Sequence, residues 1–380
     1  MYHRRALLLV AALGVVASAC SDSGEAGPTT RVETPDTATE ITEGTRASSE
    51  ARSGTSEPVV AADTTAVGTT AVPATTAATT TTVPEVARVP LTGQPLAAGE
   101  AAPDRSAMVV KIDNVGEARP QTGLNQADVV FEEVVEGRAT RFAAVFHSQG
   151  SNPVGPIRSG RTQDVDLLSG LNQPIFVWSG GNPGVERVIA ESGFHSLNAT
   201  GNPPATGFFR TDRQRPHNLF ANTDPFWDQL TWAISRPSPM FEYVEPGAAV
   251  AGDPRFFLQV QVGTNPVRWD YDAASDTYRR SQSGQPHQLT DGQANADNVV
   301  VLITNYRPSS VDARSPEAVT VGNGIAFVMS DGKLQTGVWE RADKTSPITL
   351  RTPEGAPILL APGRTWVELA DAVDHDTRSG

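Results

Sequence analysis

The stretch PIFVWSGGNPGVERVIAESG, residues 174–193, predicts a strand that leads directly into a helix. Its first residues are bulky and apolar, as in a short buried strand. Asn182 is a good N-cap, Pro183 suits the first helical turn, and Gly193 is a typical helix stop. A strand followed by a helix is the building unit of layered α/β domains.

Three further strands are predicted upstream of this stretch. MVVKID (108–113) is a short apolar run. In ADVVFEEVVEG (127–137), alternate residues fall on opposite faces of a predicted strand. The chain turns at Gly137, and TRFAAVFHS (140–148) predicts the returning strand. The last two segments therefore predict a β-hairpin.

Two more helices are predicted on either side of the opening stretch. TQDVDLLSGL (162–171) predicts a short helix, and TDPFWDQLTWAI (223–234) predicts another with Thr223 as its cap. Because strands alternate with helices, we expect an α/β domain with a mixed sheet and flanking helices over residues 97–239.

The second half of the chain has a different sequence pattern. Alternating or continuous apolar runs occur in RFFLQVQVG (255–263), VRWDYDAASDTYRR (267–280), NVVVLITNY (298–306) and RTWVELA (364–370). In IAFVMSDGKLQTGVWER (325–341), Asp331-Gly332 is a strong hairpin signal. These patterns predict a mostly antiparallel β-rich domain over residues 240–372, followed by a disordered tail at 373–380. Its strands either pack on the first domain or extend the first domain's sheet.

The N-terminal region predicts export. Residues 1–19 combine a basic start with an apolar run that is too short to span a membrane, as in a signal peptide. Cys20, the single cysteine, follows Ala-Ser-Ala and resembles the lipidation site of bacterial lipoproteins. The Thr-, Ala- and Pro-rich residues 20–96 predict a disordered stalk. We therefore expect a protein anchored by lipid to the extracytoplasmic face of the cell membrane.

GPIRSGRT (155–162) differs by one residue from the phosphate-binding loop G-x-x-x-x-G-K-[ST]. Pro156 removes one of the N–H groups that such a loop presents to phosphates, and Arg161 replaces the compact lysine. Export also argues against ATP as the ligand. An anion site of another kind is favoured, because Arg158 and Arg161 precede a predicted helix start and arginine binds carboxylate and phosphate with two parallel hydrogen bonds.

Other polar turns carry arginine and amide side chains that are suited to the same anion. We predict that they form one arginine-rich cleft in the first domain. The predicted ligand-binding residues are Asn114, Arg119, Gln121, Arg141, Arg158, Ser159, Arg161, Arg210, Arg215 and Asn218. Nearby acids offer an alternative, in which every arginine is paired internally and the protein is a scaffold.

A catalytic alternative rests on four residues, Asp113, Glu133, Glu136 and His217. The carboxylates are suited to acid–base chemistry, and His217 is suited to the role of general base. The histidines lack metal-ligand spacing, and no cofactor motif is evident, so we expect neither a metal nor a cofactor. The formal net charge of −13 disfavours nucleic acid as a partner.

Long segments of the chain resemble the YerB-like bacterial lipoproteins, a family of unknown biochemical function. The similarity lies in residues 110–148, in GPIRSGR, in FFRTDRQRPHNLF (208–220) and in the second-half strands quoted above. It covers about residues 97–372 and implies a two-part extracytoplasmic domain. The Thr-rich stalk and the preference for Arg over Lys depart from that pattern and look actinobacterial.

A looser similarity is to the LytR-CpsA-Psr transferases, which move glycopolymers from polyprenyl pyrophosphate to peptidoglycan. We therefore expect an accessory protein that binds an anionic envelope ligand, such as a peptidoglycan carboxylate, a teichoic-type phosphate or a polyprenyl pyrophosphate. A cell-wall glycopolymer transferase or hydrolase and a scaffold are the alternatives. The sequence leaves protein partners, oligomeric state and any reaction open.

Overall fold

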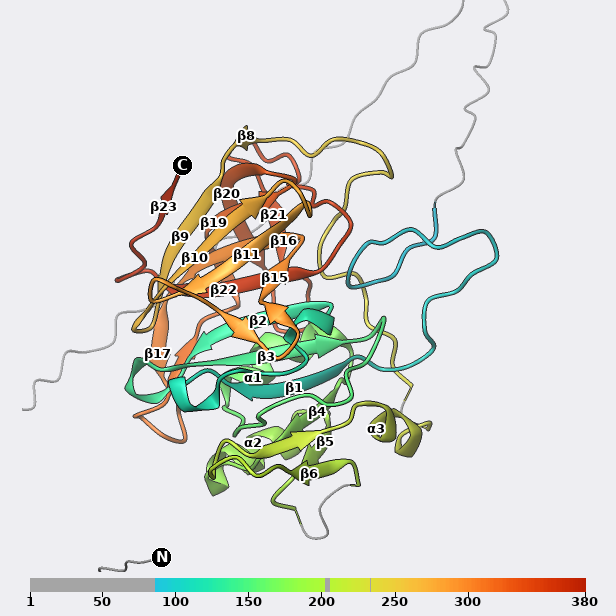
Figure 1. Cartoon of the computed structure of the whole chain (residues 1–380), viewed down its shortest axis with the longest axis vertical. Coiled ribbons are helices and arrows are strands. Elements are labelled where there is room, and N and C mark those ends of the chain that lie inside the picture. The colour runs from blue at the N-terminus through green and yellow to red at the C-terminus, as the bar shows by residue number, and fades with distance from the viewer. Residues whose placement is uncertain (1–85, 202–205, 233) are drawn as a thin grey trace, which may run out of the picture. The chain divides into compact units, whose positions relative to one another are not determined.

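One large mixed sheet runs through the part of the chain that the computed structural model describes, residues 86–201, 206–232 and 234–380 (Figure 1). Its strand order is β21–β20–β19–β16–β22–β2–β3–β1–β4–β5. In that order the strands span Thr349–Arg351, Lys333–Arg341, Gly322–Ser330, Asn298–Thr304, Thr365–Asp371, Val129–Val134, Thr140–Phe146, Met108–Asp113, Ile175–Trp178 and His195–Asn198. The strands of the second half therefore extend the sheet of the first half.

The two halves meet at β22, which pairs in parallel with β16 on one side and with β2 on the other. The remaining pairs of the second half are antiparallel: β16 with β19, β19 with β20, and β20 with β21 and β8 (Asp253–Pro254). This arrangement confirms the predicted fold class. The boundary placed at residue 240 stays a prediction, because the sheet is continuous across the two halves.

Most local predictions in the first half are confirmed, except that the helix predicted over residues 223–234 ends at Gln229 and the Thr223 side chain forms no capping hydrogen bond. β2 and β3 form the antiparallel hairpin, and β1 pairs antiparallel with β3 and parallel with β4. β4 leads into α2 (Pro183–Ala190), and β5 returns parallel to β4. The Asn182 side chain accepts a hydrogen bond of 3.0 Å from the Val185 N–H, as an N-cap should. The two other α-helices are α1 (Gln163–Leu168) and α3 (Asp224–Gln229).

In the second half, the hairpin predicted at Asp331-Gly332 joins β19 and β20, and both turn residues have positive φ. A second sheet has the order β12–β11–β10–β9–β23, with β15 paired to β11. Its strands span Gln285–Pro286, Thr277–Gln282, Asn265–Asp272, Phe257–Val262, Arg378–Ser379 and, for β15, Asn295–Ala296. The β10–β11 hairpin confirms the prediction from residues 267–280.

Short elements complete the described chain. Three two-stranded ladders pair β6 (Phe208–Arg210) with β7 (Leu219–Ala221), β13 (Gln288–Leu289) with β14 (Gly292–Gln293), and β17 (Tyr306–Pro308) with β18 (Pro316–Ala318). Four 3₁₀ turns span Gly116–Ala118, Leu124–Gln126, Glu136–Arg138 and Ser169–Leu171. Among the residues described, no helix has the length and apolar character needed to cross a membrane.

Apolar cores lie on both faces of the large sheet. On one face the second sheet packs across it, with β9 against β22 and β2 and with β11 against β16 (Figure 1). The other face is covered by α1 and α2, whose apolar residues pack against Phe131, Val145 and Phe176. Successive side chains of β2 point to opposite faces of the sheet, so Val130 belongs to the first core and Phe131 to the second.

Two segments depart from the sequence predictions at the ends of the folded part. Residues 86–96, assigned to the stalk, are described, and Leu91 is fully buried, with its carbonyl accepting a hydrogen bond of 2.8 Å from Tyr243. The tail at 373–380 was predicted to be disordered, but β23 pairs with β9, and Phe257 donates a hydrogen bond to the carbonyl of Gly380. The predicted signal peptide, Cys20 and the stalk up to residue 85 lie outside the described residues.

Candidate functional site

The loop formed by GPIRSGRT lies where two parallel strands separate. β1 pairs with β4 only over Met108–Val110. Beyond that point the loop inserts between them: the Arg158 N–H donates to the carbonyl of Lys111 (2.9 Å), and the Ser179 N–H donates to the carbonyl of Arg158 (3.0 Å). The carboxyl ends of such strands are the usual ligand site of α/β sheets.

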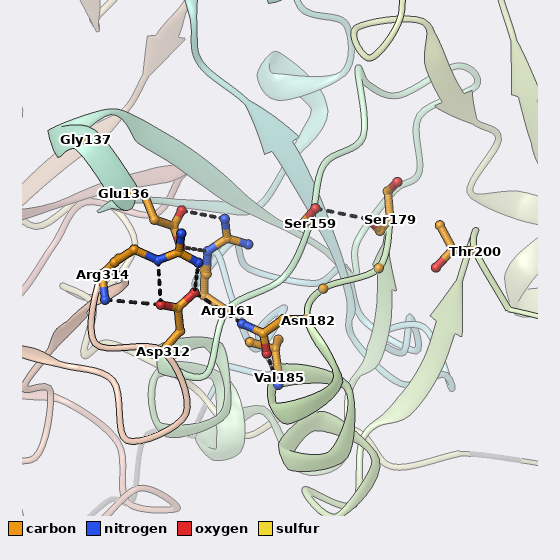
Figure 2. A pocket seen from close by; sticks show the side chains of 12 residues that line it. Glu136, Gly137, Ser159, Arg161, Ser179, Asn182, Val185, Thr200, Asp312 and Arg314 are labelled. Carbon is orange, nitrogen blue, oxygen red and sulfur yellow. Dashed lines mark hydrogen bonds and ion pairs between the residues drawn. The ribbon is translucent and has the colours of Figure 1, made fainter. Parts of the chain in front are cut away.

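A cavity of about 660 Å³ opens at this edge of the sheet. Figure 2 shows its lining residues. They come from the β2–β3 turn, the 155–162 loop, the glycine turn after β4, the start of α2, the segment after β5 and the β17–β18 loop. The polar members are Glu136, Ser159, Arg161, Ser179, Asn182, Thr200, Asp312 and Arg314. Its size lies within the range of small-ligand sites.

Arg161 forms the wall of the cavity together with Glu136. Its Nε donates to Glu136 Oε1 at 2.7 Å, its Nη2 donates to the other carboxylate oxygen, and its Nη1 donates to the carbonyl of Gly160 at 2.7 Å. Burial alone would raise the pKa of Glu136, but hydrogen bonds from Arg161 and Ser315 outweigh it and lower that pKa to about 2. Glu136 is therefore ionised at neutral pH and acts as a partner of arginine.

The glycine spacing of the loop has a packing cause. A Cβ added to Gly160 would lie 2.9 Å from Trp178 and 3.0 Å from Ile189, so the loop needs glycine to approach β4 and α2. The Thr162 hydroxyl contacts Ser309 at 2.8 Å and also Glu317. Both residues that resembled a phosphate-binding loop thus have structural contacts, in agreement with the interpretation against ATP.

Arg314 is a charged cavity residue that the sequence analysis missed, as it missed Asp312. It forms hydrogen bonds of 3.1 Å from Nε and from Nη2 to the two carboxylate oxygens of Asp312, and its side chain is 86% exposed. Asn182, the N-cap of α2, also contacts Asp312 at 3.3 Å. The sequence around Arg314 matches no known motif, and its approach to α2 depends on the β17–β18 loop reaching the first half.

A second cluster lies behind the loop, at the carboxyl end of β1. Asp113 Oδ2 lies 2.9 Å from Arg158 Nε and 3.0 Å from His217 Nδ1. Arg141 pairs with Asp113 in the β1–β3 register and donates a hydrogen bond of 2.9 Å to the carbonyl of Ser159. Burial lowers the pKa of Arg141 to about 10, and the nearby Arg161 and Arg158 act in the same direction. Three predicted arginines therefore lie close together.

Glu133 has a different environment from the other predicted catalytic groups. It is fully buried on the opposite face of β2 from Glu132 and forms an ion pair with Lys111. Lys111 also lies 2.8 Å from Asp164 at the start of α1. These buried charges join β1, β2 and α1, and Glu133 does not line the cavity. These contacts favour a structural role for Glu133.

Asn114, Arg119 and Gln121 belong to a third group, which faces the second sheet. Asn114 donates to Glu132, and Gln121 contacts the buried His287 at 2.9 Å through its amide oxygen. Arg119 donates to the carbonyl of Asn114 at 3.2 Å. These contacts fix the turn after β1 to the second half of the chain.

Arg210, Arg215 and Asn218 lie on the β6–β7 ladder and its loop. Arg210 donates a hydrogen bond of 2.7 Å to Asn218 Oδ1, and Arg215 is exposed. The prediction of one shared cleft is therefore corrected: of the predicted site residues, only Glu136, Ser159 and Arg161 line the cavity. Arg141 and Arg158 lie behind the cavity loop, in the cluster around Asp113, whereas Arg119 and Arg210 lie on turns that are bound to other elements.

The described residues contain no cluster of His, Cys, Asp and Glu side chains that could hold a metal ion. The cavity lining combines the guanidinium groups of Arg161 and Arg314 with the carboxylates of Glu136 and Asp312.

Comparisons with known proteins give one consistent relationship. Residues 91–233 match the "Protein of unknown function (DUF3048) N-terminal domain", and residues 258–367 match the corresponding C-terminal domain. The chain is 27% identical over 307 residues to "Putative lipoprotein YerB" of Bacillus subtilis (strain 168), covering 77% of this chain and 89% of the relative. The crystal structure of the YerB protein from Bacillus subtilis superimposes with a TM-score of 0.66 at 24% identity, over 77% of this chain and 99% of the other.

Proposed function

The chain belongs to the DUF3048 family of proteins of unknown function, and from this premise we propose that it is a lipid-anchored extracytoplasmic protein that binds an anionic ligand of the cell envelope. Support for the anchor comes from Cys20 after an apolar leader and from the similarity to a relative named as a lipoprotein. Two or more acyl chains at Cys20 would hold the protein firmly at the membrane.

The single observation that carries the ligand proposal is the cavity at the carboxyl ends of β4 and β5. Its wall contains Arg161, its rim contains Arg314, and the first turn of α2 contributes Asn182 and Val185. The N-terminus of a helix attracts negative charge through its free N–H groups and its dipole. Arg314 is 86% exposed and can reach a ligand while it keeps its contact with Asp312, because a guanidinium has five N–H donors.

Binding is tested by calorimetry with the full-length protein in detergent, titrated with inorganic pyrophosphate, glycerol phosphate and a muropeptide. We expect Arg161→Ala to weaken binding of the preferred probe about 10- to 100-fold, since a hydrogen bond to a charged group contributes about 1.5–3 kcal/mol. Arg314→Ala should have a smaller effect.

Arg378→Ala is the matched control. Arg378 forms the same two hydrogen bonds to Asp376 that Arg314 forms to Asp312, and it lies on β23, away from the cavity. Equal affinity of the wild type and the Arg161 variant for every probe would refute the cavity as the site. If no probe binds the wild type, the scaffold alternative with internally paired arginines is favoured instead.

As a second candidate we infer a glycopolymer transferase or hydrolase, which the contact between Asp113 and His217 favours. A carboxylate on Nδ1 orients the ring, so that Nε2 is placed to accept a proton from an attacking water or hydroxyl. Arg158, beside Asp113, could stabilise the negative charge that develops on a phosphoryl centre. Neither Asp113 nor His217 lines the cavity, so this candidate does not depend on the first.

Product formation from a polyprenyl-pyrophosphate-linked glycan tests the second candidate. His217→Ala should reduce turnover about 100-fold or more, as expected for loss of a general base. His195→Ala, at a partly exposed histidine that contacts the Trp232 ring, should leave it unchanged. An unchanged rate in the His217 variant, or no product with the wild type, would exclude this reaction.

A further inference from the structure

A second cavity, of about 330 Å³, lies next to the first. The two cavities have two lining residues in common, Gly137 at the β2–β3 turn and Arg314 on the β17–β18 loop. The first cavity ends on the first half of the chain at α2, whereas the second continues over β17, with Tyr306 and Pro308 in its lining. The shared residues show that the two cavities are adjacent.

The second cavity is rich in positive charge. Its lining contains three arginines, Arg138, Arg307 and Arg314, and a single acid, Asp371. The whole chain carries a formal net charge of −13, so a local excess of arginine is opposite to the general character of the protein. Such an excess in a concave surface favours an anionic occupant.

The arginines of the second cavity are available to a ligand. Their side chains are 47% (Arg138), 57% (Arg307) and 86% (Arg314) exposed. Their present partners are the carboxylates of Asp374 for Arg138, of Glu317 and Asp166 for Arg307, and of Asp312 for Arg314. The Arg138–Asp374 pair is exposed on both sides, so a ligand anion can replace Asp374 at little cost. The side chains of Glu317 and Asp312 are only 11% and 16% exposed, so Arg307 and Arg314 would keep these partners and bind the ligand through their remaining N–H donors.

Apolar surface accompanies the charge. Val134, Pro308 and Pro316 contribute to the same lining, and the Tyr306 ring is held there because its hydroxyl donates to the carbonyl of Leu369 at 2.9 Å. A mixture of flat apolar groups with charged donors suits a ligand that has carbon-rich units between its anionic groups. A bare inorganic ion would leave this apolar surface unused.

We propose that the two cavities are adjacent subsites of one groove, and that the ligand is an extended polymer with regularly spaced anionic groups. One unit of the polymer would bind at Arg161, and a later unit at Arg307 and Arg138, with Arg314 contacting the segment between them. This inference rests on the proposed function, and it specifies the ligand as a chain. Phosphodiester and carboxylate polymers share this chemistry.

Chain length is the variable that tests the proposal. Calorimetric titrations of the full-length protein use two series of probes, oligomers of glycerol phosphate and oligomers of galacturonate, from one to about ten units, at a fixed concentration of anionic groups. We expect the affinity to rise at least tenfold once the oligomer reaches from one cavity to the other, because the second contact becomes intramolecular. The better series identifies phosphate or carboxylate as the anion.

Three variants separate the subsites. Arg307→Ala should remove most of the gain for long oligomers and leave the monomer affinity unchanged, whereas Arg161→Ala should weaken both. Arg138→Ala is a second test of the same subsite if the Arg307 variant melts at a lower temperature than the wild type. Arg378→Ala controls for the general loss of one positive charge.

The outcomes distinguish this inference from the proposed function. Monomers that bind through Arg161 with no gain for longer oligomers would overturn the polymer inference and leave the anion site standing. A gain that Arg307→Ala and Arg378→Ala reduce equally would assign it to general electrostatics, and would also overturn the inference. No binding at any length would refute the proposed function itself.

Discussion

Replacing Lys111 by methionine is expected to destabilise the protein by about 3–5 kcal/mol, because the change leaves buried carboxylates without their counter-ion. The Lys111 side chain is 0% exposed, as are those of its partners Glu133 and Asp164. Methionine has a similar length and fills the same space, so the loss of charge is the main effect. Urea unfolding followed by tryptophan fluorescence measures the change.

The control is Lys344→Met at an exposed loop position, which should change the free energy of unfolding by less than about 0.5 kcal/mol. Adding Glu133→Gln and Asp164→Asn to the Lys111 variant should recover much of the stability, since no unpaired charge then remains. A loss below about 1 kcal/mol for Lys111→Met alone would mean that these carboxylates are not held as anions by the lysine.

Arg280→Met is expected to cost a similar amount, about 3–5 kcal/mol, at the contact between the two sheets. The guanidinium is fully buried, forms an ion pair with Glu132 and lies 3.6 Å from Glu368. It also lies over the Trp366 ring at 5.2 Å. Removing the guanidinium leaves the Glu132 carboxylate unpaired. Glu132→Gln should also be destabilising, because it leaves the buried Arg280 without this counter-ion.

Unlike Arg280→Met and Glu132→Gln, the substitution Glu368→Gln is not expected to destabilise the protein. Burial and the neighbouring Glu132 raise the pKa of Glu368 well above its usual value, so that the native state holds a proton which the unfolded state releases above about pH 4.5. The unfolded state then binds fewer protons, and the stability contributed by this group is lost as the pH rises. Glutamine removes this loss and can still accept the hydrogen bond from Trp269.

We therefore expect Glu368→Gln to be at least as stable as the wild type at pH 7, with an advantage that grows between about pH 5 and pH 8. Urea unfolding at four pH values in this range measures it. A variant less stable than the wild type by more than about 1 kcal/mol at every pH would show that Glu368 is ionised in the folded protein.

Local order in this protein follows from local sequence. The β2–β3 hairpin, the capped helix α2 and the Asp331-Gly332 turn were predictable, because each depends on periodicity or on residues that favour one backbone conformation. Position within the sheet was not predictable. RTWVELA indicated a strand, but an apolar strand accepts several neighbours, and its place between β16 and β2 depends on contacts far along the chain.

The candidate site was predictable only in part, for a related reason. Arg161 was found because it occurs beside a turn and a helix start, whereas Arg314 enters through a loop of the other half. Arg119 and Arg210 were predicted as neighbours because they also lie in polar turns, yet these turns bind to other elements. Leu91 carried a usable signal, since a large apolar residue is out of place in a stalk.

The position of β22 also governs the order in which the protein is assembled. During synthesis β2 emerges early, but its partner on one side, residues 365–371, emerges only after nearly all of the other strands. Until then the hairpin has an open edge of the kind that recruits strands from other chains. Pairing between distant segments is slow. A chain threaded unfolded through a membrane would therefore be vulnerable to aggregation on the far side until β22 had arrived and closed the sheet.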